Sequence, residues 1–307
     1  MNDPLVSICC ITYNHEQYIR DAIDGFLMQN TDFPFEICLG EDESNDGTRE
    51  ICQEYADKFP DKIRLFLRSR KDVIYINGQA TGRYNFIETL KECKGKYIAL
   101  CDGDDYWTDP LKLQKQVDFM EASPNSSICF HPVIIRDDRY KGIKYSQEIS
   151  LNWQMNFDTL LLSCYIHTSS VLFRHSTLNK IPTWLSNISQ GDWALFLLFS
   201  KKGNIGFINE TMGVYRRHSK GLWTKQDRIV RLIKEIQMFN IIGKEFRINY
   251  LKNFRISQAK RHLKLSSLFR KKGFHSLANH NALRGYLWLP SFNNIDGLKS
   301  IIHNVLL

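Results

Sequence analysis

The stretch Lys96-Tyr97-Ile98-Ala99-Leu100-Cys101-Asp102-Gly103-Asp104-Asp105-Tyr106-Trp107 decides the fold class. Residues 97–101 are mostly apolar without helical spacing, which predicts a buried strand, and three carboxylates around Gly103 follow directly. Ligands of open α/β sheets bind at the carboxyl ends of the strands, and carboxylate oxygens suit Mg²⁺ or Mn²⁺. The stretch therefore predicts a metal site for a phosphate-bearing substrate; the alternative is an ordinary solvated Asp-Gly turn.

Strands and helices are predicted to alternate on both sides of this stretch. Upstream, the apolar pattern predicts strands at residues 6–12, 35–39 and 63–67, and helices at 19–27, 51–59 and 84–93. Downstream it predicts helices at 110–120, 157–162 and 190–199, an apolar run at 128–135, and strands at 167–173, 204–209 and 212–215. This alternation predicts an α/β fold with a mostly parallel sheet covered by helices.

Two familiar phosphate-binding loops are absent from the sequence. There is no Gly-x-Gly-x-x-Gly after the first strand and no Gly-x-x-x-x-Gly-Lys-Ser/Thr, which excludes the dinucleotide fingerprint and the phosphate-cradling loop. A metal held by carboxylates is then the obvious means of holding a phosphate.

Composition indicates a globular protein of a reducing compartment. Of 307 residues, 43% are hydrophobic and 24% charged, and no apolar run approaches the roughly 18 residues that span a bilayer. The N-terminus shows no basic region followed by an apolar one, and the eight cysteines contain no Cys-x-x-Cys pair. We therefore expect a cytoplasmic protein.

The charge is distributed unevenly along the chain. From Ser219 onward there are 17 Lys and Arg against 4 Asp and Glu, a net +13, which leaves −5 of the total +8 for residues 1–218. This basic tail is predicted to be helical, with an amphipathic last stretch at 287–306, and to meet an anionic partner, a membrane surface rather than nucleic acid. Two alternatives stay open: a solvated helical surface with no partner, and a tail packed on the body.

Two downstream residues are candidates for chemistry. Asp192 begins the apolar helix predicted at 190–199, and its structural alternative is a helix N-cap. His218 follows the strand predicted at 212–215 in the run Tyr215-Arg216-Arg217-His218, and its alternative is a solvated side chain.

Taken in chain order, five motifs resemble the family 2 glycosyltransferases, which have the GT-A fold, and in particular those of bacterial polysaccharide synthesis. The motifs are Thr12-Tyr13-Asn14, residues 41–48, Asp102-Gly103-Asp104-Asp105, Gly191-Asp192-Trp193 and Tyr215-Arg216-Arg217-His218. The likeness covers about residues 4–222. It implies a Rossmann-like GT-A catalytic domain over residues 1–223, followed by a basic α-helical C-terminal extension over residues 224–307.

The resemblance implies roles for matching positions. Asp104 and His218 would bind Mn²⁺ or Mg²⁺ together with the donor diphosphate, and Asp192 would be the catalytic base. The residues expected to bind the nucleotide sugar are Thr12, Tyr13, Asn14, Glu41, Asp42, Asn85, Asp102 and Arg216, with Arg83 as a weaker candidate.

The sequence departs from the family pattern in its acidic loops. The common Asp-Asp-Gly-Ser is replaced by Glu41-Asp42-Glu43-Ser44, and the longer side chain of Glu41 shifts the expected base contact toward Asp42. The acid that usually precedes the catalytic base is replaced by Gly191.

The resemblance implies an inverting, metal-dependent glycosyltransferase. It would move a sugar from a nucleotide donor, expected to be uridine diphosphate-linked, to a saccharide or lipid-linked glycan in surface polysaccharide synthesis at the cytoplasmic face of a membrane. Because Gly191 replaces an acid, a non-catalytic carbohydrate-binding or scaffolding protein is the alternative. A sugar nucleotidylyltransferase is disfavoured because residues 1–30 contain no basic glycine-rich loop.

Overall fold

A computed structural model describes residues 3–140, 143–146, 154–178, 180–219, 221, 226–248 and 251–289. The last part of the amphipathic stretch expected at 287–306, from residue 290 onward, lies outside the described residues.

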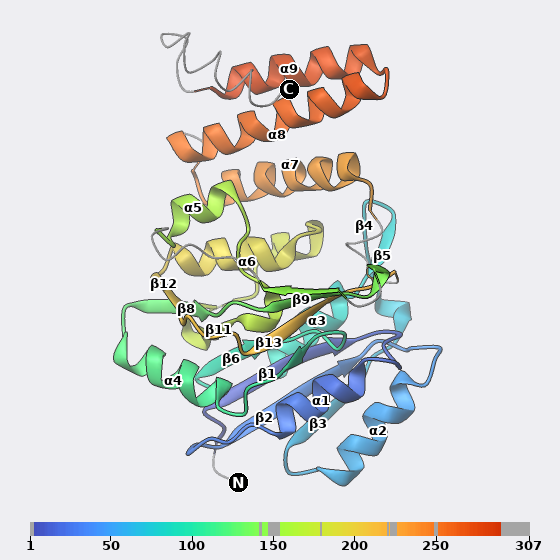
Figure 1. Cartoon of the computed structure of the whole chain (residues 1–307), viewed down its shortest axis with the longest axis vertical. Coiled ribbons are helices and arrows are strands. Elements are labelled where there is room, and N and C mark those ends of the chain that lie inside the picture. Colours follow the sequence, from blue (N-terminus) through green and yellow to red (C-terminus); the bar gives the residue numbers. More distant parts are fainter. Residues whose placement is uncertain are drawn as a thin grey trace.

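A seven-stranded sheet forms the centre of the molecule (Figure 1). Its strand order is β12 (Asn204–Phe207), β8 (Ser126–Phe130), β11 (Leu172–Arg174), β6 (Tyr97–Leu100), β1 (Val6–Thr12), β2 (Phe35–Glu41) and β3 (Ile63–Leu67). Strands β6, β1, β2 and β3 run parallel to their neighbours within this group, and β12 runs parallel to β8. Only β11 is antiparallel to both strands beside it. The prediction of a mostly parallel sheet is therefore confirmed.

Helices cover both faces of this sheet because successive side chains of the buried strands point to opposite sides. In β1, Ile8 and Cys10 belong to one hydrophobic cluster while Cys9 belongs to the other. The first cluster lies between the sheet and three helices, α1 (Ile19–Leu27), α2 (Thr48–Lys58) and α4 (Lys112–Ala122). Helices α1 and α2 are on the lower side of the sheet in Figure 1. The second lies under α3 (Arg83–Glu92), α5 (Phe157–Leu162) and α6 (Gly191–Ser200).

A second, four-stranded sheet lies beside the first. Its order is β10 (Ile143–Ser146), β9 (Ile134–Asp137), β13 (Gly213–Arg217) and β7 (Tyr106–Trp107), and β4 (Ile74–Ile76) pairs separately with β5 (Gln79–Thr81). The apolar run at 128–135 thus divides between β8 and β9, which belong to different sheets. Pairing of β13 with β7 brings the residues before His218 next to the loop that follows β6.

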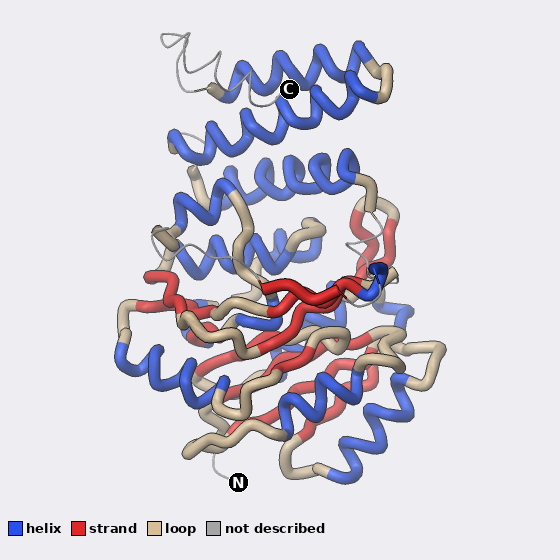
Figure 2. The backbone as a smooth tube through the Cα atoms, in the orientation of Figure 1, coloured by secondary structure: helices blue, strands red, loops and turns tan. Residues whose placement is uncertain are grey.

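The C-terminal helices α7 (Arg228–Glu245), α8 (Lys252–Lys271) and α9 (His275–Trp288) form successive layers above α6 (Figures 1 and 2). The ring of Phe239 in α7 lies 5.2 Å from that of Trp193 in α6, edge to face. Ser257 Oγ of α8 donates to the carbonyl of Leu161 at 2.5 Å. The helices therefore pack on the body through a shared core.

The start of one helix differs from expectation. The helix expected at 110–120 begins at Lys112, because the carbonyl of Pro110 accepts from the backbone N–H of Asn30 at 2.8 Å instead of entering the helix.

Among the described residues, no helix combines the length and the apolar character that crossing a bilayer requires.

Candidate active site

One large cleft opens at the carboxyl ends of β1, β2 and β6, beneath the C-terminal helices. Its volume is about 1780 Å³. Ten of the residues expected in the site line it: Thr12, Tyr13, Asn14, Asp42, Asn85, Asp102, Asp104, Asp192, Arg216 and His218. Glu41 does not. Loops that are distant in sequence therefore meet in one place.

The loop after β6 is held tightly against β1. The N–H of Gly103 donates to the carbonyl of Ile11 at 2.9 Å, and a Cβ at residue 103 would lie 2.7 Å from Thr12 Oγ1. Asp105 is buried and accepts from the backbone N–H of Arg216 at 2.8 Å. Glycine at 103 thus permits the close approach that aims the flanking carboxylates at the cleft.

Asp104 lies between two imidazoles. Its Oδ2 is 3.0 Å from His218 Nε2 and 3.8 Å from His15 Nε2, and one ligand atom of each residue lies within 4.8 Å of the others. Burial opposes ionisation of Asp104, but His15 and then His218 hold the pKa of its carboxyl below the usual value. Two imidazole nitrogens and one carboxylate oxygen fit Mn²⁺ better than Mg²⁺, which prefers oxygen ligands alone.

Sequence reasoning did not single out His15. The only signal was its position directly after the Thr12-Tyr13-Asn14 motif, at the carboxyl end of the first strand. Its backbone N–H donates to Thr48 Oγ1 at 2.8 Å, which fixes the loop beside the start of α2. Burial lowers the pKa of the His15 imidazole, although Asp104 opposes this. A neutral imidazole is the form that binds a metal.

The guanidinium of Arg83 lies within electrostatic range of two carboxyl groups of the site, those of Asp192 and Asp102. Burial lowers the pKa of its guanidinium, which the charges of Asp192 and Asp102 oppose. Burial likewise raises the pKa of Asp102 to about 8, with further contributions from Asp104 and Asp192. The cation therefore offsets the repulsion between carboxylates that approach one another in a poorly hydrated cleft.

The glycine before Asp192 has a steric cause. A Cβ at residue 191 would lie 2.0 Å from Arg83 Nη1. Arg83 Nη2 donates to the carbonyls of Ile188 and Ser189 at 3.3 and 3.2 Å. The guanidinium thus fills the space that an acidic side chain at residue 191 would need.

Asp192 is not the N-cap of its helix. Gln190 is the N-cap residue and makes no side-chain cap hydrogen bond, whereas Asp192 lies inside the first turn of α6. Its Oδ2 accepts from Thr168 Oγ1 at 3.4 Å. The N-cap alternative is therefore wrong, although a carboxylate in the first turn still gains from the helix dipole.

Arg70 contacts both Asp42 and the ring of Tyr13. Arg70 Nη1 lies 2.6 Å from Asp42 Oδ2, and its guanidinium carbon lies 4.2 Å from the centroid of the Tyr13 ring. Burial raises the pKa of Asp42 to about 6, although Arg70 opposes the shift. Arg70 was not predicted, because it follows β3 in a short 3₁₀ turn without any recognisable pattern.

Glu41, expected to bind the nucleotide, is engaged by protein groups, and its contact with a nucleotide stays a prediction. Its side chain is fully buried, and its carboxylate accepts from the backbone N–H groups of Glu43 and Ser44 at 3.2 and 2.7 Å. Arg49 Nε forms an ion pair with the same carboxylate at 2.5 Å. Glu43 has φ of 59°, the left-handed backbone that favours glycine, at the position where the family pattern has one. In this structure the carboxylate of Glu41 therefore holds the loop after β2 in place.

Two other expected residues lie at the wall but have their polar groups engaged. Asn85 is buried, donates to the carbonyl of Gly40 at 2.9 Å and accepts from Thr89 Oγ1 at 3.1 Å, which joins α3 to β2. The Arg216 guanidinium donates to the carbonyl of Asp104 at 3.1 Å and to the carboxylate of Asp21. Both position the loops that carry the site.

The sheet, the acidic loops at its carboxyl edge and the cleft agree with the fold that the motifs led us to expect, and comparisons with known proteins identify the family. The family model "Glycosyl transferase family 2" matches residues 7–219, and the chain belongs to this family. The mannosyltransferase PcManGT of Pyrobaculum calidifontis, solved with GDP-Man and Mn²⁺, has a TM-score of 0.59 and 17% identity, covering 100% of this chain and 82% of that one. The fold is therefore GT-A, as expected.

Two sequence relatives illustrate the range of the family. The Mycobacterium tuberculosis protein Rv1520 is 41% identical over 222 residues, which is 71% of this chain but only 60% of that protein. The Escherichia coli UDP-Glc:alpha-D-GlcNAc-diphosphoundecaprenol beta-1,3-glucosyltransferase WfgD is 29% identical over 209 residues, 68% of this chain and 75% of that one.

Proposed function

We propose that this chain is an inverting, metal-dependent glycosyltransferase that moves a sugar from a UDP-sugar to a saccharide or lipid-linked glycan in surface polysaccharide synthesis. One observation carries the proposal. The Asp104 cluster, the Tyr13 and Asp42 pair, and Asp192 line a single cleft in a chain of family 2. The name of WfgD, which includes a UDP-sugar and a lipid-linked acceptor, supports the choice of substrates.

The donor would lie along the floor of the cleft. Tyr13 offers a face on which a base can stack, and Asp42 can accept from the N3–H of uracil. Asp102 would lie near the ribose, and His15, Asp104 and His218 would hold the ion that binds the diphosphate. When bound, that ion offsets the negative charge that develops on the leaving diphosphate.

Asp192 would act on the acceptor. Its carboxylate accepts the hydroxyl proton while the acceptor oxygen forms a bond to the anomeric carbon. The bond from that carbon to the diphosphate breaks on the opposite side, so the configuration inverts. The nearby charge of Arg83 would favour the deprotonated carboxylate that a base requires.

The test is hydrolysis or transfer from a nucleotide sugar with Mn²⁺. Thermal shifts with UDP, GDP and CDP would first identify the base, since a ligand that binds the native state alone raises its stability. Turnover of the matching sugar nucleotide should then be lost in Asp104→Asn and Asp192→Asn but kept in Asp118→Asn, an acid of α4 outside the cleft. Binding of nucleotide without any turnover would favour the scaffolding alternative.

We further propose that the protein acts at the cytoplasmic face of a membrane. In support, α9 is the outermost helix of the described chain (Figure 1) and exposes Leu277, Leu283 and Leu287. Sedimentation with anionic vesicles should weaken in a Leu283→Gln, Leu287→Gln variant of the full chain. Removal of residues 224–307 is unsuitable, because α7 and α8 share a core with α6. Equal sedimentation of variant and parent would remove the membrane proposal.

A further inference from the structure

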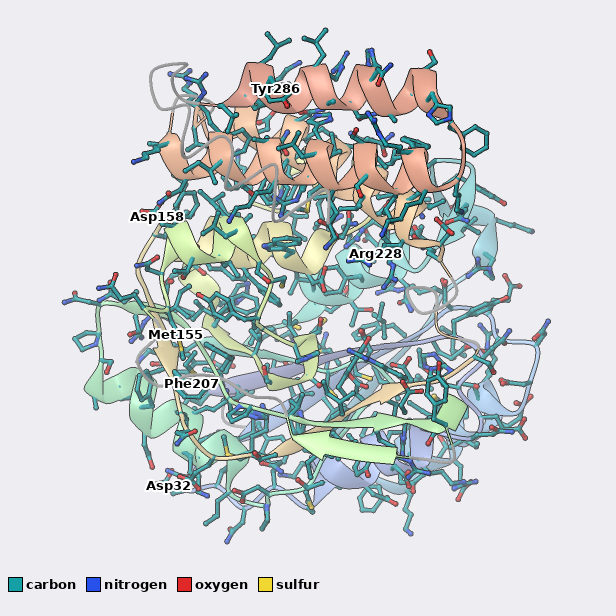
Figure 3. The ribbon with its side chains drawn as sticks, turned by 45° about the horizontal axis from the view of Figure 1, so that its top comes forward. Asp32, Met155, Asp158, Phe207, Arg228 and Tyr286 are labelled. Atoms are coloured by element: carbon teal, nitrogen blue, oxygen red, sulfur yellow. The ribbon has the colours of Figure 1, made fainter. Side chains whose placement is uncertain are left out.

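A group of cations lines the part of the cleft that α7 and α8 cover. The side chains are Arg228, Arg231, Lys260, Lys264 and Lys271. We call them the roof cations. In the part of the chain that the structure describes, none of them forms a side-chain ion pair. Figure 3 labels Arg228, between the α8–α9 pair and the body.

The roof cations repel one another. Burial and the nearby charge of Arg228 lower the pKa of Lys264. Arg261 and Arg231 act in the same direction, and Glu235 opposes them. Glu235 is already engaged, because its Oε2 accepts from Arg261 Nε at 3.1 Å. Arg231 Nε is buried without a hydrogen-bond partner among the described residues. Arg231 is half-buried and the other four side chains are exposed. A cleft wall that carries charges of one sign attracts ions of the opposite sign, so this arrangement favours a bound anion.

The roof cations and Asp192 line the same cleft. The guanidinium of Arg261 lies 5.0 Å from the ring centroid of Trp193, the residue after Asp192. Glu235, which forms the ion pair with Arg261, lines the same cleft as Asp192. The proposed diphosphate site of the donor lies instead at His15 and His218, on the floor.

We propose that Arg228, Arg231 and Lys264 bind a phosphate group of the acceptor, so that the acceptor is a phosphate-bearing glycan whose free hydroxyl faces Asp192. Guanidinium groups bind phosphate oxygens through paired hydrogen bonds, and an ammonium adds a compact charge. The inference rests on the proposed function. Two sources share this chemistry: the diphosphate of a lipid-linked saccharide and the phosphodiesters of an anionic polymer.

Calorimetric titration with three probes would test the proposal, with UDP and Mn²⁺ present to fill the donor site. The probes are a short alkyl diphosphate carrying one sugar, a glycerol phosphate oligomer, and the neutral alkyl glycoside of the same sugar. At least one phosphate probe should bind more tightly than the glycoside. Binding should weaken about tenfold or more in Arg231→Gln, Lys264→Gln, with a shallower salt dependence.

The matched control is Lys244→Gln, Arg270→Gln, which removes the same charge from α7 and α8 outside the cleft. It should leave probe affinity unchanged. Because the roof variant relieves repulsion, its melting temperature should equal or exceed that of the parent. Preference for the diphosphate probe indicates a lipid-linked acceptor, and preference for the oligomer indicates a polymer.

Three results would overturn the proposal: equal affinity for the neutral glycoside, equal losses in the two double variants, or no binding of either phosphate probe. Failure of the proposed function is separable from these. If neither UDP nor GDP binds with Mn²⁺, the probes are titrated alone with a chelator, and binding that depends on Arg231 and Lys264 then supports the anion site while the transferase assignment fails.

Discussion

The floor and the roof of the cleft present different ionisable groups. The floor, at the ends of β1, β2 and β6, presents Asp42, Asp102 and Asp104, whereas the roof on α7 and α8 presents guanidinium and ammonium groups. The difference teaches that two anionic substrates can be held in one cleft by opposite means. On the floor a divalent ion would stand between carboxylates and a diphosphate, while on the roof the side chains would meet the anion directly.

The largest expected effect concerns Asp192, the proposed base. Replacing Asp192 by Asn removes the proposed base with little change in shape, so the transfer rate should fall by about 10²–10⁴-fold. The affinity for nucleotide with Mn²⁺ should stay the same, because Asp192 does not belong to the metal cluster. Steady-state kinetics and calorimetry measure the two quantities. A loss of nucleotide affinity would mean that Asp192 serves the floor instead.

The second prediction concerns how firmly the roof is joined to the floor. Phe239→Ala removes a fully buried ring from the shared core and should lower the free energy of unfolding by about 3–5 kcal/mol. The domain boundary between residues 223 and 224 remains a prediction. Chemical denaturation of Phe239→Ala should show a single transition, shifted to a lower denaturant concentration. The control Val230→Ala, on the exposed side of α7, should change the free energy of unfolding little. A separate transition for the helices would contradict the shared core.

The third prediction sharpens the account of the floor. His15→Ala removes one proposed nitrogen ligand. The Mn²⁺ affinity in the presence of UDP should then fall by at least the about 10–100-fold that follows loss of a residue that orients a metal ligand. A chelator should abolish the added thermal stability that UDP gives the parent. His280→Ala, an exposed imidazole of α9, serves as the control. Unchanged Mn²⁺ dependence in His15→Ala would exclude that residue as a ligand.

The smallest expected effect concerns the contact between Arg83 and Gly191. Gly191→Ala should cost about 1–3 kcal/mol of stability, because the added methyl group displaces a buried guanidinium. Combining it with Arg83→Ala should cost less than the sum of the two changes. Gly82→Ala is the control, since a Cβ there meets only Ile11 Cδ1 at 3.4 Å. Additive losses would show that the two residues do not compete for space.

The sequence predicted the floor well because its signals are local. Strands β1 and β3 begin and end where expected. The apolar run of β1 is buried almost throughout, whereas β3, at the edge of the sheet, is mostly half-buried. Helix α5 also matches residues 157–162. The second sheet was not predicted. Its strands β7 and β13 are short and separated by about a hundred residues, so their pairing leaves no local pattern.

The site residues divide in the same way. Asp104 and His218 were expected together because each belongs to a motif, although 114 residues separate them. His15 and Arg70 were missed because their roles arise from contacts with Asp104 and Asp42 that only the fold creates. The absence of Glu41 from the residues that line the cleft was not foreseen, because a motif gives the position of a carboxylate and not the direction in which it points.

The tail shows a further limit of sequence reasoning. Its excess of positive charge predicted an anionic partner, but charge counts do not say which face of a helix carries the charge. Lys264 lines the cleft, whereas Arg270 on the same helix does not.

The packing of Trp193 against Phe239 has a consequence for protein engineering. A chimaera that exchanges acceptor preference between two relatives would have to transfer α6 together with α7 and α8, because cutting between them exposes matched hydrophobic surfaces. The loops after β1 and β2 make no use of that packing, so donor preference could be exchanged separately.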